Sequence, residues 1–159
     1  MEHELIPTTQ FGGCRFSSCL DAGLTLLHDI QAAHGLNLKC DILLFNVKGF
    51  FNHVNHARLV AVLSSLGFHA SLCNWTMAFL ADRKVQLHFN NLLADKHDQP
   101  VGMPQGSPLS PVLSIIYTSA LLHILQGWPS SSLGMYVDDG ILFACGPTWD
   151  DVTISLHTQ

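Results

Sequence analysis

The chain has 159 residues, of which 48% are hydrophobic and 12% charged, and its formal net charge is −5. This length fits one domain, and so apolar a composition with so few charges excludes an intrinsically disordered chain. The excess of acidic over basic residues argues against a protein that binds nucleic acid by charge alone, because phosphate affinity comes mostly from Lys and Arg.

The cysteines and the first residues indicate the compartment. The five cysteines have irregular spacing and no C-x-x-C pair, so the sequence predicts neither a disulfide framework nor a zinc ribbon. No basic segment followed by an apolar core begins at Met1, so no signal peptide is predicted. We therefore expect free thiols in a reducing compartment, and a protein that is intracellular and not secreted.

A helix and a strand are the first expected elements. Ser17 and Ser18, followed by Asp21, form a capping pattern for a helix. Its apolar residues recur at helical spacing on one face: Leu20, Leu24, Leu27 and Ile30. Residues 41–47 then read D-I-L-L-F-N-V, a short apolar run typical of a strand buried on both faces.

Two helices and a strand are expected next. Apolar residues at helical spacing predict the two helices, the first with Gly67 as its C′ residue: Leu59, Val62, Leu63 and Leu66, then Leu72, Trp75 and Phe79. Residues 84–90 alternate between apolar and polar side chains, which predicts a strand with one exposed face. Asn90 and Asn91 indicate the turn after it.

A segment without charged residues follows. The Pro- and Gly-rich residues 100–111 predict an ordered loop, with Ser110 as N-cap and Pro111 as first residue of a helix that continues through the apolar stretch 112–128. This helix carries polar side chains and reaches only the lower length limit of a membrane span. A helix of the protein core is therefore favoured over a membrane helix.

The last expected element is an acidic β-hairpin. Short apolar runs at 133–137 and 141–144 flank Asp138, Asp139 and Gly140, and the Asp-Gly pair is a turn signal. Two adjacent carboxylates on a straight strand face opposite sides, whereas at a hairpin tip both can point the same way and share a cation. Taken alone, Asp-Asp-Gly is better explained as turn chemistry.

Taken together and in this order, the motifs resemble the reverse transcriptases of non-LTR (LINE-type) retrotransposons, especially those of fungal genomes. The resemblance covers roughly residues 8–151. Its fingers motif corresponds to Q-F-G-G at 10–13 with S-S-C-L-D-A-G-L-T-L-L-H-D-I at 17–30, and its motif A to L-L-F-N-V-K-G-F-F-N-H-V-N-H-A-R-L at 43–59. Further along, F-L-A-D-R-K-V at 79–85 corresponds to a linking segment, V-G-M-P-Q-G-S-P-L-S-P at 101–111 to motif B, and M-Y-V-D-D-G at 135–140 to motif C.

The resemblance implies an α+β fold: a reverse-transcriptase palm, in which helices pack on one face of an antiparallel sheet with the Y-V-D-D hairpin, plus part of the fingers. On this basis residues 1–159 form a single partial domain, with fingers at about 8–40 and palm at about 41–155. Thumb and endonuclease domains are expected to be absent. The implied activity is RNA-directed DNA polymerase, with an RNA template, a DNA primer and deoxynucleoside triphosphates as partners.

The implied cofactor is Mg²⁺ or Mn²⁺, used in two-metal nucleotidyl transfer. By resemblance Asp138 is the chief motif C ligand, Asp139 the second, and the backbone carbonyl of Val47 a further ligand. Phe51 corresponds to the aromatic gate that excludes a ribose 2′-OH.

Further contacts follow from the same resemblance. Gln105 and Gly106 of motif B correspond to residues that contact the incoming nucleotide and the template. The family usually has an Arg directly after the fingers Gly pair; this chain has Cys14 there, and Arg15 comes one position late.

Motif A departs from the family at its metal ligand. Asn46 stands where the family has an aspartate, and an amide brings no charge and does not bridge two cations. If the carboxylate is worth several kcal/mol, its loss slows the reaction on the order of a thousandfold or more. We therefore expect weakened metal binding and absent or vestigial polymerase activity. Asn52 also replaces a usual Asp.

Other interpretations stay open. The chain could be a non-catalytic palm-fold remnant that binds RNA or a protein partner, or a decayed retroelement product without function. Exposed apolar faces would favour self-association or aggregation, and no membrane partner is expected. His53 and His56 have no nearby Cys or acid to complete a zinc site, and Trp75 with Phe79 is most simply part of a core.

Overall fold

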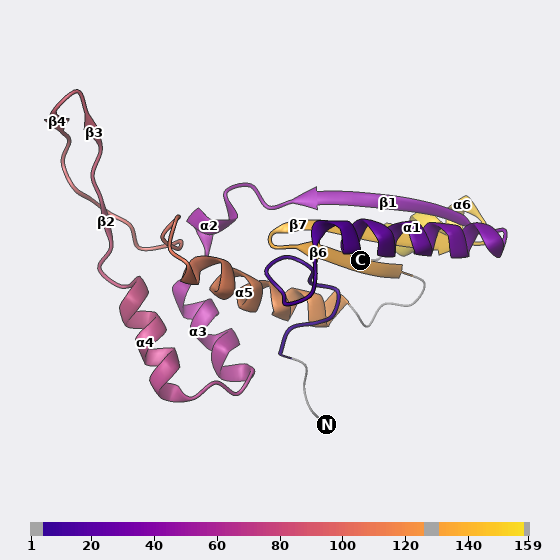
Figure 1. Ribbon diagram of the computed structural model, residues 1–159, viewed down its shortest axis with the longest axis horizontal. Coiled ribbons are helices and arrows are strands. Elements are labelled where there is room, and N and C mark those ends of the chain that lie inside the picture. Colours follow the sequence, from indigo (N-terminus) through magenta and orange to yellow (C-terminus); the bar gives the residue numbers. More distant parts are fainter. Residues whose placement is uncertain (1–4, 126–130, 158–159) are drawn as a thin grey trace. The chain divides into compact units, whose positions relative to one another are not determined.

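The computed structural model describes residues 5–125 and 131–157. It combines helices with antiparallel strands, which confirms the expected α+β class (Figure 1). The chain divides into two compact units, one formed by residues 1–48 and 111–159 and the other by residues 49–110.

The first unit is built on a three-stranded antiparallel sheet of order β1-β7-β6. Its strands are β1 (Lys39–Asn46), β6 (Ser131–Tyr136) and β7 (Asp139–Gly146), and its helices are α1 (Cys19–Gly35), α6 (Trp149–His157) and most of α5 (Leu109–Leu125). Leu122 of α5 and Leu156 of α6 pack with Leu133 and Leu142 of the sheet. Helices α5 and α6 therefore share one face of the sheet, as expected for a palm.

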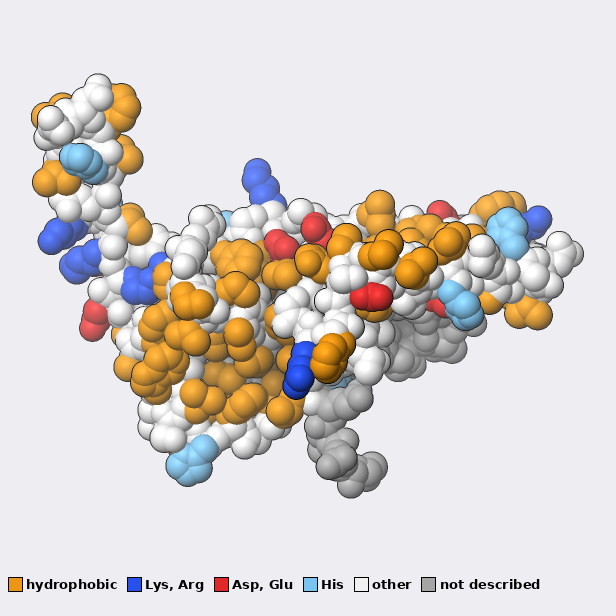
Figure 2. Space-filling model, in the orientation of Figure 1, with side chains coloured by type: hydrophobic (Ala, Val, Ile, Leu, Met, Phe, Trp, Pro, Cys, Tyr) orange, Lys and Arg blue, Asp and Glu red, His pale blue; other side chains and the backbone are white. Residues whose placement is uncertain are grey.

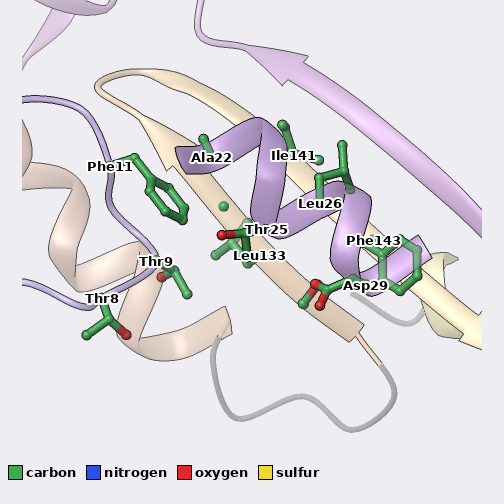
Figure 3. A pocket seen from close by; sticks show the side chains of 12 residues that line it. Thr8, Thr9, Phe11, Ala22, Thr25, Leu26, Asp29, Leu133, Ile141 and Phe143 are labelled. Atoms are coloured by element: carbon green, nitrogen blue, oxygen red, sulfur yellow. The ribbon is translucent and has the colours of Figure 1, made fainter. Parts of the chain in front are cut away.

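Helix α1 lies over the opposite face of the sheet. It does not close on the strands but leaves a cavity of about 280 Å³ (Figure 3). Leu26 and Asp29 of α1 line this cavity together with Ile141 and Phe143 of β7. Asp29 Oδ2 accepts a hydrogen bond from Ser132 Oγ at 2.7 Å, which ties the helix to β6.

The start of α1 is the predicted one, but its apolar stripe is not buried. Ser18 is the N-cap and forms a reciprocal capping box with Asp21. Helix α1 turns the face that carries Leu26 and Asp29 toward the sheet, and the neighbouring leucine stripe therefore stays at the surface (Figure 2). The exposed members of that stripe are Leu20, Leu24 and Leu27.

Strand β1 corrects one prediction. The run over 41–47 was expected to be buried on both faces, yet β1 is an edge strand and Leu43 and Leu44 are 46% and 69% exposed. The central strand is β7, which pairs with both neighbours and carries most of the buried positions. Apolar content alone does not tell an edge strand from a central one, because the order of strands is set by long-range pairing.

Helix α5 begins two residues earlier than predicted. Ser110 and Pro111 were expected as N-cap and first residue, whereas the helix starts at Leu109. Ser107 Oγ accepts from the Leu109 N–H at 3.3 Å, and Ser110 Oγ donates to the Pro104 carbonyl at 2.6 Å. Pro111 is tolerated as the third residue because N–H groups in the first turn have no partner within the helix. The predicted end at residue 128 lies outside the described residues.

No helix in residues 5–125 or 131–157 is long and apolar enough to cross a membrane.

The second unit contains three helices and a β-ribbon. The helices are α2 (Phe50–His53), α3 (His56–Ser65) and α4 (Ala70–Leu80), and buried residues of α3 and α4 form its core. Gly67 has a φ of 83° just after α3, as predicted for a C′ residue. Trp75 stacks on Phe79 with ring centroids 5.4 Å apart, but it is exposed and not a core residue.

The ribbon replaces the single strand predicted over 84–90. It consists of four two-residue strands: β2 (Lys84–Val85), β3 (His88–Phe89), β4 (Leu92–Leu93) and β5 (His97–Asp98). Asn90 and Asn91 have φ values of 47° and 61°, the pattern of a two-residue type I′ turn, so the predicted turn is confirmed. All eight strand residues are exposed, because nothing in this unit packs over the ribbon.

Candidate active site

The acidic hairpin is formed by β6 and β7. Its turn lies directly before the Asp139-Gly140 pair and does not include that pair. Tyr136 pairs with Asp139, so the two-residue loop is Val137 and Asp138. Val137 has a φ of 65°, an uncommon conformation for a β-branched residue. Asp138 is therefore at the tip and half-buried, while Asp139 is the first residue of β7 and exposed.

Gln10 holds this strained turn in place. Its side chain is 1% exposed, and Oε1 accepts from the Val137 N–H at 3.1 Å and from the Gly12 N–H at 3.1 Å. Its Nε2 also donates to the Val137 carbonyl at 3.5 Å. One buried amide side chain thus joins the Q-F-G-G segment at residues 10–13 to the turn that carries Asp138.

Backbone contacts reinforce the same junction. Phe11 N–H donates to the Met135 carbonyl and Met135 N–H to the Thr9 carbonyl, both at 2.8 Å, so this segment extends the edge of β6. A Cβ atom on Gly12 would lie 2.5 Å from the Val137 nitrogen. Glycine is required there because the two backbones are too close to admit a side chain.

The register of β1 brings position 46 beside the acidic hairpin. Asn46 pairs with Asp139, and Asp139 pairs with Tyr136 on its other side. Directly opposed residues in antiparallel strands project to the same face with Cβ atoms roughly 4.5–5.5 Å apart. The amide of Asn46 therefore neighbours the Asp139 carboxylate. Val47 follows as the first residue beyond the paired part of β1 and is exposed.

Phe45 and Gly140 set this register on the other face of the sheet. They pair directly, and a Cβ on Gly140 would overlap the Phe45 ring. The ring can lie flat against the backbone of β7 only because residue 140 has no side chain. This contact fixes which residue of β1 meets Asp139.

The loop before α1, residues 13–18, has one charged side chain, that of Arg15. Burial raises the pKa of the Cys14 thiol, so the position where the resemblance expects an Arg holds a neutral group at physiological pH. The Arg15 guanidinium lies over the Phe16 ring, 4.5 Å from its centroid. At the start of α1, hydrogen bonds from Ser18 lower the pKa of Asp21, whose carboxylate is the acceptor in the capping box.

The second unit contains the other predicted contact residues, gathered around the motif B loop. Gln105 Nε2 donates to Asn52 Oδ1 at 3.3 Å, and the Met103 N–H donates to the Phe51 carbonyl at 2.6 Å. Phe51 is half-buried and meets Phe50 edge-to-face with centroids 5.5 Å apart. Gly106 has a φ of 85° and open space around it, so its glycine serves the turn.

Gly102 is the anchor of this loop. Its carbonyl accepts from Arg83 Nη1 at 2.7 Å and lies 2.7 Å from His56 Nε2, and its N–H donates to the Val54 carbonyl. The other nearby histidine, His53, has its Nδ1 2.8 Å from the Gly49 carbonyl. Both imidazoles therefore have backbone partners in this unit.

Predicted residues thus fall into two groups. In the first unit Asn46, Val47, Asp138 and Asp139 come together at one end of the sheet. Arg15 is in the loop that follows Gly12, the residue whose backbone lies against Val137. In the second unit Phe51 and Gln105 lie on linked segments, with Gly106 beside them. No cluster of three or more His, Cys, Asp or Glu side chains suited to a metal ion occurs among the residues that the structure describes.

Sequence reasoning did not assign roles to Gln10 and Gly102. Gln10 opens the Q-F-G-G motif, and a polar residue in an apolar context before a glycine pair could have suggested a buried structural amide. Its partner is 127 residues away, so no local pattern names it.

Comparison with known proteins identifies the family. The family model described as reverse transcriptase (RNA-dependent DNA polymerase) matches residues 1–156. A probable RNA-directed DNA polymerase from transposon BS of Drosophila melanogaster is 26% identical over 120 residues, which are 76% of this chain and 13% of that protein. The chain thus spans about an eighth of the length of that relative.

Solved structures show the same fold. Telomerase from Candida albicans, in complex with a TWJ fragment of telomeric RNA, superposes with a TM-score of 0.68 at 16% identity, covering 89% of this chain and 28% of that one. Apo telomerase from Candida tropicalis gives a TM-score of 0.56 at 14% identity, covering 89% and 31%. The predicted resemblance is confirmed: the chain belongs to the reverse transcriptase (RNA-dependent DNA polymerase) family.

Proposed function

We propose that this chain carries the catalytic centre of an RNA-directed DNA polymerase, which extends a DNA primer on an RNA template with deoxynucleoside triphosphates. The observation that carries the proposal is the strand register at the acidic hairpin. It aligns Asn46 with Asp139 and leaves Asp138 at the adjoining turn. Family membership supports the reaction class.

The oxygen atoms at the hairpin fit a hard divalent cation, Mg²⁺ or Mn²⁺. Mg²⁺ is commonly held through one or two carboxylates plus substrate phosphates, and Asp138 and Asp139 are two adjacent carboxylates at an exposed sheet end. Asn46 Oδ1 and the Val47 carbonyl complete the proposed set. When bound, such cations stabilise the attacking and leaving oxygens of an in-line displacement.

The chain's own residues position the substrates. Gln10 keeps the Val137–Asp138 turn rigid, so that the carboxylates do not have to be ordered when substrate binds. Phe51 is proposed to exclude a ribose 2′-OH, and its backbone is held by the motif B loop. Gln105, Gly106 and Arg15 are proposed to contact the incoming nucleotide and the template.

Asn46 is proposed to weaken this site. Two carboxylates and one amide suit one cation held partly by substrate phosphates, but they lack the third carboxylate that would bridge two cations. We expect a rate lower on the order of a thousandfold or more than with Asp at position 46, about 4 kcal/mol or more in activation free energy.

Compartment and association are also proposals. All five cysteines, each within the described ranges, are free thiols, which fits a reducing intracellular compartment. The exposed leucines of α1 and β1 would support self-association.

Primer extension tests the proposal. Native protein, Asn46→Asp and Asn46→Ala are compared on an RNA template with Mg²⁺ and with Mn²⁺. Asn46→Asp should raise the rate by at least a hundredfold, Asn46→Ala should not, and Asp138→Asn in the Asn46→Asp background should abolish the gain. Robust synthesis by the native chain that Asn46→Asp leaves unchanged would refute the role of position 46.

A second function is favoured by the same residue. If the chain is a non-catalytic palm that binds RNA, it does not need a metal-binding aspartate, and Asn at position 46 has no effect on its function. In that case Asn46→Asp gains no synthesis, while RNA binding by the native protein persists without any divalent cation.

A further inference from the structure

Phe16 is the most exposed large hydrophobic residue among those that the structure describes, with 89% of its surface open to solvent. Its ring contributes almost no buried area to the core. The Ser17 N–H donates to the Cys14 carbonyl, so Phe16 is the third residue of a turn. Its φ of 61° is a value that turns of this kind normally assign to glycine or asparagine.

The local backbone therefore holds a bulky aromatic side chain outward in a conformation that is unfavourable for it. Strained positions of this kind occur preferentially where a side chain serves a ligand. Packing does not explain the residue, because the ring has little to pack against beyond its neighbour. That neighbour is the Arg15 guanidinium, 4.5 Å from the ring centroid.

The turn is anchored to the acidic hairpin. Gly12 is too close to Val137 to carry a side chain, and both N–H groups bind Gln10. A Cβ on Gly13 would overlap Ile115 Cδ1, so the chain lies against α5 at the next residue. Phe16 follows Gly12 by four residues, which places the two Cα atoms within about 14 Å of each other. This is an upper limit on the distance from Phe16 to the segment that contacts the hairpin.

Charge is scarce in this part of the protein. The first unit has only three basic residues, Arg15, Lys39 and Lys48. A chain with so few cations gains little affinity from phosphate contacts, whereas base stacking on an aromatic ring does not depend on net charge. An exposed Phe beside an Arg is the pair of groups that a single-stranded nucleic acid binds through its bases and its backbone.

We propose that Phe16 is a stacking platform for a base of single-stranded RNA, with Arg15 bound to the adjoining phosphate, an inference that rests on the proposed function. The ring would hold the template strand on the segment that is anchored to the acidic hairpin. Phe16 is thus a positioning residue for the strand.

The experiment is a titration of the full chain with a fluorescein-labelled single-stranded RNA, followed by fluorescence anisotropy at low ionic strength, without divalent cations or nucleotides. Phe16→Ala and Phe16→Leu should weaken binding roughly tenfold, since one stacked base typically contributes that much. Phe16→Trp should bind at least as tightly as the native chain. Phe89→Ala is the matched control, because Phe89 is also exposed, at 68%, in the ribbon, and it should bind as native.

Two further readouts separate stacking from other effects. An oligonucleotide of the same length without bases should bind the native chain and Phe16→Ala equally. Arg15→Ala should lower the slope of log affinity against log salt by about one, whereas Phe16→Ala should leave that slope unchanged. Phe16→Gly should keep or raise the urea midpoint while it weakens RNA binding, because glycine relieves the positive φ.

Several outcomes overturn the inference: no RNA binding by the native chain, binding within twofold of native for Phe16→Ala or Phe16→Leu, an equal loss in Phe89→Ala, or a base-free strand that distinguishes Phe16→Ala from native. The titration contains no metal or triphosphate. Its failure is therefore separate from a failure of primer extension, which tests the proposed polymerase.

Discussion

Replacing Gln10 with leucine should destabilise the first unit and release the acidic turn. The substitution leaves two backbone N–H groups without an acceptor, that of the buried Gly12 and that of the half-buried Val137, each now 3.1 Å from Gln10 Oε1. A buried donor left unpaired costs about 1–3 kcal/mol, and the Val137 N–H belongs at the low end of this range because water can approach it. We expect a loss of about 2–4 kcal/mol in the free energy of unfolding.

Urea denaturation followed by far-ultraviolet circular dichroism measures this loss. For a slope of about 2 kcal/mol per molar urea, the midpoint should fall by about 1–2 M. Gln31→Leu is the matched control, since Gln31 is exposed on α1 in the same unit, and it should change stability by no more than about 0.5 kcal/mol. Amide exchange should also rise at Gly12 and Val137. A Gln10→Leu protein as stable as the control, with unchanged exchange at these two amides, would refute the role assigned to Gln10.

Gly140→Ala should lower the free energy of unfolding by about 1–3 kcal/mol, because its methyl group would overlap the Phe45 ring and force β1 and β7 apart. Urea denaturation measures this loss. Gly23→Ala is its control and should instead stabilise the helix by about 0.5–1 kcal/mol, since nothing lies within 4 Å of its added methyl group; destabilisation of similar size in both would contradict the packing argument. Asp21 has a lowered pKa in the folded chain, so its contribution to stability is present above the ordinary carboxyl pKa and is lost as the pH falls through the lowered value. Asp21→Asn should therefore flatten the fall in stability of native protein below about pH 4, as measured by thermal melting at pH 2 to 7, and an unchanged pH profile would count against the capping box.

Elements defined by local contacts were predictable from the sequence. The Ser18–Asp21 capping box uses residues three apart, and Gly67 and the Asn90–Asn91 pair adopt the positive φ values that their residue types favour. These features depend on neighbouring residues alone. For the same reason the motif residues of the site could be named before their geometry was known.

Features defined by long-range contacts were not predictable. β1 reads as a buried strand, yet it is an edge because β7 takes the centre of the sheet. The Asp139-Gly140 pair reads as the turn, but the turn lies at Val137 and Asp138, where Gln10 binds both polar groups of the Val137 backbone. Residue propensity favours a turn that includes the glycine, and it does not take in the hydrogen bonds that Gln10 makes with Val137, 127 residues away.

The site was predictable in composition and not in arrangement. Asn46, Asp138 and Asp139 were identified from motifs, whereas the direct pairing of Asn46 with Asp139 follows from the β1–β7 register. That register depends on Phe45 covering Gly140, a contact that no periodicity reveals. The structure thus adds the direct pairing of residue 46 with Asp139, on which the proposed role of position 46 rests.

The proposed weakening of the metal site by Asn46 can be measured by a titration of Mn²⁺ followed by electron paramagnetic resonance. Native protein is compared with Asn46→Asp and with Asn55→Asp, which adds the same charge at the N-cap of α3, where Asp and Asn are equivalent. If Asn46 weakens the metal site, Asn46→Asp should bind Mn²⁺ at least tenfold more tightly than the native chain, Asp138→Asn should remove this gain, and Asn55→Asp should behave as native. Equal Mn²⁺ affinity of the native and Asn46→Asp proteins would contradict it.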